Sequence, residues 1–172
     1  MNFTEFKLNA QILSGVKELG YETATPIQEK AIPSILAGLD VVGTAQTGTG
    51  KTAAFALPLL QRLMDGPRGQ LRGLILAPTR ELAEQIRQSI DRLAIRTGLR
   101  CTAIYGGANL VKQYQILRRG VDIVIACPGR LLDHINRGNI NLTQVEVLVL
   151  DEADHMFDLG FREPIYKIIR HL

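Results

Sequence analysis

The residues with the clearest chemical potential are Lys51 and Thr52, which end a glycine-rich stretch reading DVVGTAQTGTGKT at positions 40–52. Gly48 and Gly50 allow the backbone to turn tightly, and the apolar run that follows is typical of a helix. Backbone N–H groups at a helix start lack intrahelical partners and carry the positive end of the helix dipole, so they suit phosphate oxygens. The stretch predicts a triphosphate-binding loop in which Lys51 reaches the β- and γ-phosphates and Thr52 holds Mg²⁺.

One position departs from the strict pattern G-x-x-x-x-G-K-[ST], which asks for glycine where this chain has Ala45. A glycine-rich turn with a surface lysine is the alternative. The β-branched Val41 and Val42 predict a buried strand before the turn, and this strand–turn–helix context favours the phosphate loop. The nucleotide-binding residues predicted in this loop are Gln46, Thr47, Gly48, Thr49, Gly50, Lys51 and Thr52.

Two carboxylates, Asp151 and Glu152, follow the apolar run Val147–Leu150. At the mouth of a buried strand, Asp151 is placed to hold Mg²⁺ opposite Thr52, and Glu152 is suited to orient or deprotonate the water that attacks the γ-phosphate. Acidic residues also stabilise helix starts, which is the structural alternative. Together with the phosphate loop, the pair predicts nucleotide hydrolysis, with Glu152, Asp151 and Lys51 as the catalytic residues.

The hydrophobic periodicity predicts alternating strands and helices, and therefore an α/β fold with a parallel sheet and helices on both faces. The expected strands begin at Asp40 and cover 73–77, 101–105, 122–126 and 145–150; the expected helices cover 10–19, 26–36, 53–63, 81–97, 110–118 and 131–137.

The carboxyl ends of parallel strands meet at one edge of the sheet, where ligands bind. The small, polar and charged loops of this chain all follow predicted strands. Singly, each has a structural explanation: Thr79 as a helix cap, Gly106 and Gly107 as a turn, Pro128 as a helix start and Arg130 as a solvated charge. Their common edge favours a ligand-binding role.

The overall composition constrains the function less than these motifs do. The 172 residues are 46% hydrophobic and 22% charged, with a formal net charge of +3, which permits a polyanionic partner without requiring one. Cys101 and Cys127 lack metal-site spacing, so we expect buried reduced thiols. No apolar run is long enough to span a bilayer and Met1–Lys7 has no export-signal pattern, so we expect an intracellular, cytoplasmic protein.

In their order along the chain, these motifs closely resemble those of the first RecA-like domain of a bacterial DEAD-box RNA helicase. The resemblance covers essentially all 172 residues. The matching motifs are Gly20–Gln28 (Q motif), Ala45–Thr52 (motif I), Pro78–Ala83 (Ia), Gly106–Gly107 (GG), Pro128–Arg130 (Ib) and Asp151–Asp154 (II). Ala45 fits, because motif I of this family begins with alanine.

The resemblance implies that Gln28 reads the adenine edge and so selects ATP. From spacing alone, Gln28 instead completes a capping box with Thr25, and both interpretations stay open. The resemblance further implies that Tyr21 packs on the base, that Phe3 supports it and that Thr25 belongs to the nucleotide site. It implies RNA-backbone contacts, with little sequence preference, by Pro78, Thr79, Arg80, Gly106, Gly107, Pro128, Gly129 and Arg130.

Two residues depart from the family pattern: Ala24 replaces a proline, and Cys127 replaces a threonine that could contact RNA. The resemblance implies an N-terminal RecA-like domain over 1–172, with a Q-motif region at 1–38 and a P-loop core at 39–172. It also implies that motif III and a second RecA-like domain lie outside this chain. The expected function is ATP-dependent RNA strand separation, and the chain alone should bind nucleotide weakly and not unwind.

Two other functions compete with this one. An RNA-binding or scaffolding module that keeps a P-loop without turnover is the first, and intact Lys51, Thr52, Asp151 and Glu152 argue against it. A P-loop GTPase or small-molecule kinase is the second. It would need an Asn/Lys-x-Asp motif or an acceptor pocket, and the sequence indicates neither.

Overall fold

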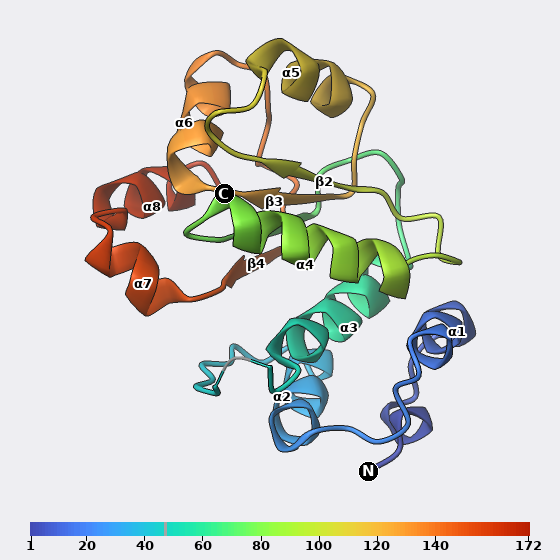
Figure 1. Ribbon diagram of the computed structural model, residues 1–172. Coiled ribbons are helices and arrows are strands. Elements are labelled where there is room, and N and C mark those ends of the chain that lie inside the picture. The colour runs from blue at the N-terminus through green and yellow to red at the C-terminus, as the bar shows by residue number, and fades with distance from the viewer. Residues whose placement is uncertain (47) are drawn as a thin grey trace. The chain divides into compact units, whose positions relative to one another are not determined.

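The structure is a computed structural model that describes every residue except Thr47, and it forms two compact units (Figure 1). The first unit contains residues 1–66 and 89–99, and the second contains 67–88 and 100–172.

The first unit is helical. Its elements are the 3₁₀ helix η1 (Phe3–Phe6), α1 (Ala10–Glu18), α2 (Pro26–Leu36), α3 (Lys51–Leu63) and the end of α4 (Arg80–Leu93). Helices α2 and α3 pack together, and Leu57 and Leu60 of α3 are fully buried. The backbone N–H of Asn9 donates to Gln61 Oε1 at 2.7 Å, which ties the start of α1 to α3. This packing fixes the two helix starts, α2 and α3, that carry the Q motif and the phosphate loop.

The second unit is built on a parallel sheet of four strands in the order β2-β3-β1-β4 (Figure 1). Gly73 lies opposite Ile123 on one side and opposite Val147 on the other. The strands are β1 (Gly73–Leu76), β2 (Cys101–Ile104), β3 (Ile123–Ala126) and β4 (Val147–Leu150). The central strands β1 and β3 are buried at every position, as expected of a sheet covered on both faces.

Helices complete the second unit. They are the start of α4, α5 (Leu110–Arg118), α6 (Pro128–Asn136), α7 (Ala153–Asp158) and α8 (Arg162–Ile169). One face of the sheet packs Leu74 and Val124 against α6, α7 and α8 through Leu131, Met156 and Ile165. The alternate residues of the central strands, such as Ile75 and Ile125, face the other side and are buried as well, which confirms the predicted α/β class with a parallel sheet.

The predicted strand after Asp40 is wrong. Residues 39–46 form no strand, and Val42 is 99% exposed where a buried position was expected. A strand exists only through hydrogen bonds to a neighbour, and none of the described strands pairs with this segment. Five strands were predicted and four occur in the described residues.

Two further differences concern helices. α4 ends at Leu93 rather than at Thr97, whose hydroxyl and backbone N–H both donate to Ala94 O in a closing turn. α6 begins at Pro128 rather than at Leu131, because proline suits the first helical position.

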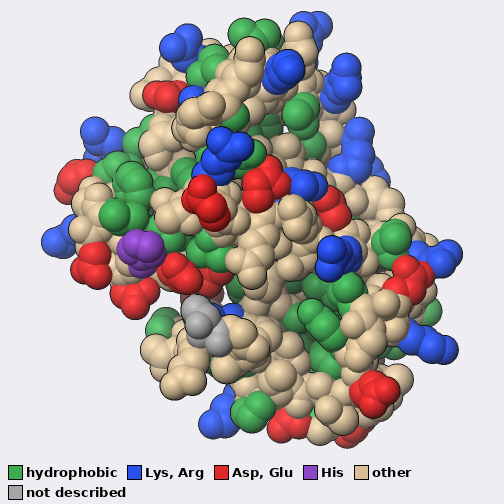
Figure 2. Space-filling model, in the orientation of Figure 1, with side chains coloured by type: hydrophobic (Ala, Val, Ile, Leu, Met, Phe, Trp, Pro, Cys, Tyr) green, Lys and Arg blue, Asp and Glu red, His purple; other side chains and the backbone are tan. Residues whose placement is uncertain are grey.

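The visible face carries charges of both signs. Figure 2 shows acidic and basic side chains interspersed over the visible face rather than gathered into one basic patch. Among the described residues, no helix combines the length and apolar character that crossing a membrane requires.

Candidate nucleotide and RNA sites

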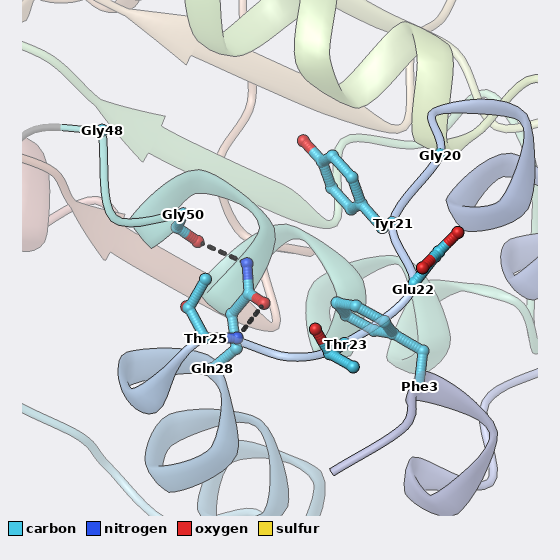
Figure 3. Close-up of a pocket in the computed structure, with 9 residues that line it drawn as sticks. All are labelled: Phe3, Gly20, Tyr21, Glu22, Thr23, Thr25, Gln28, Gly48 and Gly50. Carbon is cyan, nitrogen blue, oxygen red and sulfur yellow. Dashed lines mark hydrogen bonds between the residues drawn. The ribbon is translucent and has the colours of Figure 1, made fainter.

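A pocket of about 450 Å³ lies in the first unit where the Q-motif loop meets the turn before α3 (Figure 3). Its lining residues are Phe3, Gly20, Tyr21, Glu22, Thr23, Thr25, Gln28, Gly48 and Gly50. The structure therefore brings residues of the predicted Q motif and of the predicted phosphate loop to one cavity.

Gln28 connects the two motifs. Its side chain is on the first turn of α2 and is only 3% exposed. Gln28 Oε1 accepts from the backbone N–H of Thr25 at 2.9 Å, which is the capping contact predicted from spacing. Gln28 Nε2 donates to Gly50 O at 3.0 Å, a contact with the phosphate loop that spacing did not predict (Figure 3).

The hydroxyl of Thr25 faces the backbone N–H of Gln28 as in a capping box, yet Thr25 Oγ1 makes no hydrogen bond. It is the one buried side-chain oxygen or nitrogen without a partner in the described part of the chain. Buried polar atoms in folded proteins nearly always have a partner, so this oxygen, on the wall of the pocket, suits a polar ligand atom. The cavity fits a nucleotide in this respect.

Two aromatic rings supply the apolar part of the pocket. Phe3 is 2% exposed and packs edge-on against Phe6, with ring centroids 5.9 Å apart. Tyr21 is 41% exposed, and its ring centroid lies 6.0 Å from that of Phe3 with a tilt of 30°. An accessible ring backed by a buried one can pack against a flat base.

The phosphate end of the pocket is the start of α3. Gly50 precedes the helix with φ +85°, and a Cβ there would lie 2.4 Å from Gln28 Nε2, so the position requires glycine. Thr49 Oγ1 donates to Gln46 O at 2.7 Å. Lys51 and Thr52 occupy the first helical turn and are half-buried. Thr47, also predicted in this site, lies outside the described residues.

In the second unit, the four motif loops that follow β1 to β4 lie at the carboxyl edge of the sheet, because all four strands are parallel. This confirms the predicted common edge for motifs Ia, GG, Ib and II. The phosphate loop was predicted on the same edge, but it follows none of the described strands. The residues following the strands include Pro78, Thr79 and Arg80 after β1, Gly106 and Gly107 after β2, Pro128, Gly129 and Arg130 after β3, and Asp151 and Glu152 after β4.

Motif Ia opens α4. The backbone N–H of Leu82 donates to Thr79 Oγ1 at 3.2 Å, so Thr79 has the capping role considered for it. The guanidinium of Arg80 lies 5.0 Å from the centre of the Tyr105 ring. Tyr105 Oη donates to Glu84 Oε1 at 2.7 Å, and this bond raises the pKa of Tyr105. Partial burial opposes ionisation of Glu84, but hydrogen bonds from Arg87 and Tyr105 lower its pKa overall.

The GG loop and motif Ib are joined directly. Arg130 Nη1 donates to Ala108 O at 3.0 Å, so the first turn of α6 is tied to the residue after Gly107. Gly106, Gly107 and Gly129 are exposed, and a Cβ at any of them would meet no atom within 4 Å. The space beside these three glycines is thus open to a ligand.

Motif II forms a tight turn between β4 and α7. Glu152 has φ +51°, a left-handed conformation that is uncommon for a residue with a side chain and occurs often at functional sites. Asp151 Oδ1 accepts from the backbone N–H of Glu152 at 3.1 Å, and Glu152 Oε2 lies 3.3 Å from His155 Nδ1. These contacts orient the carboxylates of Asp151 and Glu152.

The described residues contain no group of three or more His, Cys, Asp or Glu side chains that could hold a metal by themselves. A divalent ion would need further oxygen ligands, as the phosphates of a nucleotide provide.

The sequence profile described as DEAD/DEAH box helicase matches residues 25–172. The chain belongs to this family. The resemblance inferred from the motifs is therefore confirmed.

Helicases in several organisms are similar to the chain. The ATP-dependent RNA helicase CshA of Listeria monocytogenes is 46% identical over 170 residues, which are 99% of this chain and 32% of that protein. The ATP-dependent rRNA helicase rrp3 of Emericella nidulans is 48% identical over 172 residues, covering 99% of this chain and 37% of that protein. The crystal structure of a hypothetical ATP-dependent RNA helicase from Sulfolobus tokodaii matches with a TM-score of 0.87 and 38% identity, over 95% of this chain and 47% of that one. The chain spans about a third of the length of these curated relatives.

For this member of the DEAD/DEAH box helicase family, the structure assembles the predicted site in two parts. Gln28 and the phosphate loop meet in the first unit, and motifs Ia, GG, Ib and II share an edge in the second. Lys51 and Thr52 belong to the first unit and Asp151 and Glu152 to the second, so their joint geometry remains a prediction. None of the sequence motifs predicted Gln113, a polar residue 6% exposed that contacts Arg130.

Proposed function

We propose that the chain is the N-terminal, ATP-binding and RNA-binding domain of an ATP-dependent RNA helicase that couples ATP hydrolysis to local RNA strand separation. The observation that carries the proposal is the pocket in which Gln28 reaches from the Q motif to Gly50 of the phosphate loop. A pocket that can contact a base and its phosphates at the same time suits a nucleotide better than inorganic phosphate or a free base.

Adenine recognition is assigned to Gln28, Tyr21 and Phe3. Gln28 Nε2 carries a second hydrogen besides the one used by Gly50 O, and its Oε1 has a second lone pair besides the one used by Thr25. The amide can therefore donate to a ring nitrogen and accept from an exocyclic amine, the pattern along one edge of adenine. Guanine presents an acceptor where adenine presents that amine, so Gln28 disfavours GTP.

Hydrolysis is assigned to four residues. Lys51 neutralises phosphate charge, and Glu152, whose carboxylate is oriented by His155, positions the attacking water. Thr52 and Asp151 are the residues that would hold Mg²⁺, which would supply positive charge to the phosphates. The intact set disfavours a scaffold that keeps an inactive P-loop.

RNA binding is assigned to the carboxyl edge of the sheet in the second unit. Thr79, the glycines of the GG loop and Gly129 offer hydroxyl and backbone groups suited to phosphate oxygens. The chain has no Trp and only 5% aromatic residues, so base stacking contributes little. RNA sequence preference should be slight. The same proposal includes a second RecA-like domain elsewhere in the full protein, and a cytoplasmic location.

The test is to measure ATP and GTP affinity of the full-length protein with and without several unrelated single-stranded RNAs. We expect ATP to bind more tightly than GTP, RNA and ATP to strengthen each other's binding, and the RNA affinities to agree within about tenfold, or 1.4 kcal/mol. Equal affinity for ATP and GTP would remove the adenine assignment. RNA binding without ATP turnover above a Lys51→Ala variant would favour the scaffold instead.

A further inference from the structure

A buried polar cluster lies between α5 and α6 in the second unit, behind the exposed GG loop. Its centre is Gln113 of α5, which is 6% exposed, next to His134 of α6, which is fully buried. Gln113 Oε1 accepts from Arg130 Nη1 at 3.0 Å and lies 3.2 Å from His134 Nε2. Gln113 Nε2 donates to Tyr105 O at 3.1 Å. Both ends of this amide are therefore used.

The hydrogen bonds define the state of His134. Gln113 Oε1 can only accept, so His134 Nε2 carries the hydrogen. His134 Nδ1 then accepts from Asn139 Nδ2 at 3.3 Å. Burial, and after it the positive charge of Arg130, lowers the pKa of His134, which agrees with a neutral ring. Asp133 opposes this shift, and Arg137 adds to it.

The cluster holds the GG loop at both ends. Tyr105 directly precedes the two glycines and its carbonyl accepts from Gln113. Ala108 directly follows them and its carbonyl accepts from Arg130 Nη1, which also donates to Gln113. The side chain of Arg130 is only 13% exposed and its Nε lies 3.7 Å from Asp133 Oδ2, so most of this guanidinium is engaged inside the unit. Between the two fixed ends, the glycines remain exposed.

We infer that Gln113 is a positioning residue for RNA: it fixes the GG loop against the first turn of α6, so that the open backbone groups of Gly106, Gly107 and Gly129 face the phosphates in one arrangement. The inference rests on the proposed RNA-binding function. Glycine has the greatest backbone freedom of any residue, so a loop of two glycines would lose much entropy on binding unless it were held beforehand. Gln113 supplies this restraint without touching RNA itself.

The substitution Gln113→Met tests the inference, because it keeps the length of the side chain and removes every hydrogen bond. Gln115→Met is the matched control, since Gln115 is exposed on the same helix. The measurement is ATP hydrolysis by the full-length protein as a function of the concentration of a ten-nucleotide oligouridine. We expect Gln113→Met to raise the oligouridine concentration for half-maximal stimulation about tenfold and to leave kcat at saturating oligouridine unchanged. Gln115→Met should change neither value.

Amide hydrogen exchange provides a second readout. Gly106, Gly107 and Ala108 should exchange faster in Gln113→Met than in the native protein. Gln113→Glu, the fallback if Gln113→Met does not fold, retains the acceptor for Arg130 but loses the donor to Tyr105, so it should free the Tyr105 end of the loop in the same assay. The same substitution in an Arg130→Met background completes a double-mutant cycle. If Gln113 acts through Arg130, the effects of the two substitutions on the half-maximal oligouridine concentration are not additive in free energy.

An unchanged half-maximal concentration in a folded Gln113→Met protein would overturn the inference. A fall in kcat with an unchanged half-maximal concentration would overturn it too, because that result indicates a general structural defect. If oligouridine does not stimulate the native protein at all, the proposed RNA-binding function fails first, and the role of Gln113 fails with it.

Discussion

The substitution Gln28→Glu separates the capping role of this residue from its contact with the phosphate loop. A carboxylate at position 28 could still accept from the backbone N–H of Thr25, as Gln28 Oε1 does at 2.9 Å. It could not donate to Gly50 O, which lies 3.0 Å from Gln28 Nε2. A carboxylate oxygen would instead face the carbonyl oxygen of Gly50 at a position where the native side chain is only 3% exposed. If Gln28 were only a cap, the change would be neutral.

The expected cost can be set from these contacts. Losing one hydrogen bond costs about 1 kcal/mol, and the approach of a desolvated oxygen to Gly50 O adds a similar amount. Gly50 O keeps the N–H of Ala54 as a donor at 3.2 Å, which limits the loss of stability. We expect the free energy of unfolding to fall by about 2 kcal/mol at pH 8, which lowers Tm by about 4–8 °C in a chain of this size. ATP affinity should fall by at least about 1 kcal/mol, because a carboxylate cannot donate to adenine.

The loss should depend on pH with a defined sign. Burial beside a carbonyl raises the pKa of the introduced carboxyl in the folded state above its unfolded value of about 4.3. The protonated form can donate to Gly50 O, so the deficit is small at low pH and grows as pH rises through the raised pKa.

Urea unfolding of the native chain and of Gln28→Glu at several values between pH 5 and pH 8 measures this dependence. Gln11→Glu is the charge-matched control, since Gln11 is exposed on α1, and it should change stability by no more than about 0.5 kcal/mol. Native-like stability of Gln28→Glu at pH 8, or a deficit that does not vary with pH, would refute the reasoning about Gly50.

Three further predictions concern other residues. Burial raises the pKa of Cys127 to about 11, so at pH 8 about one thiol in a thousand is ionised; in a Cys101→Ser background, iodoacetamide should modify Cys127 at least about 100-fold more slowly than free cysteine, and comparable rates would contradict the burial. Burial lowers the pKa of His134, so below about pH 6.5 the unfolded chain takes up a proton that the folded chain does not, and the free energy of unfolding should decrease as the pH is lowered. The variant His134→Gln should therefore lose less stability between pH 7 and pH 5 than the native chain, and equal losses would argue against a buried neutral ring. The 172-residue chain alone should hydrolyse ATP no faster than its Lys51→Ala variant, because an arginine finger from a second domain is worth about 10³ to 10⁵ in rate; phosphate release well above that variant would show that one domain suffices.

The sequence predicted those features that depend on local pattern. Helices such as 26–36 and 110–118 were predicted with the bounds that the structure gives them, because capping residues and glycines mark their ends. The common edge of the motif loops followed from parallel topology alone. Gln28 and Thr25 are separated by three positions in the sequence, so the spacing predicted their contact. Gln28 and Gly50 are separated by 22 positions, and no local pattern predicted that contact.

Failures arose where the outcome depends on distant partners. The β-branched Val41 and Val42 favour a strand, yet a strand also needs a neighbour, which no local pattern reveals. Gln113 and His134 looked like ordinary polar residues of helices, and only tertiary packing buries them beside each other. Helices α7 and α8 were not predicted, since α7 has six residues and α8 eight, too few for a clear period.

The two edges of the sheet differ in how they would meet another strand. At the β2 edge, the carbonyl that follows the strand, Tyr105 O, already accepts from Gln113, and the charged Arg87 and Lys112 lie beside the strand. The β4 edge, Val147–Leu150, is half-exposed at each of its four residues and carries neither charge nor proline. Natural sheets usually guard such an edge, because its open backbone groups can template a neighbour. A further strand is therefore more easily added beside β4 than beside β2. A strand from elsewhere in the protein can pair with β4, and when none does so, protein at high concentration is most prone to self-associate through this edge.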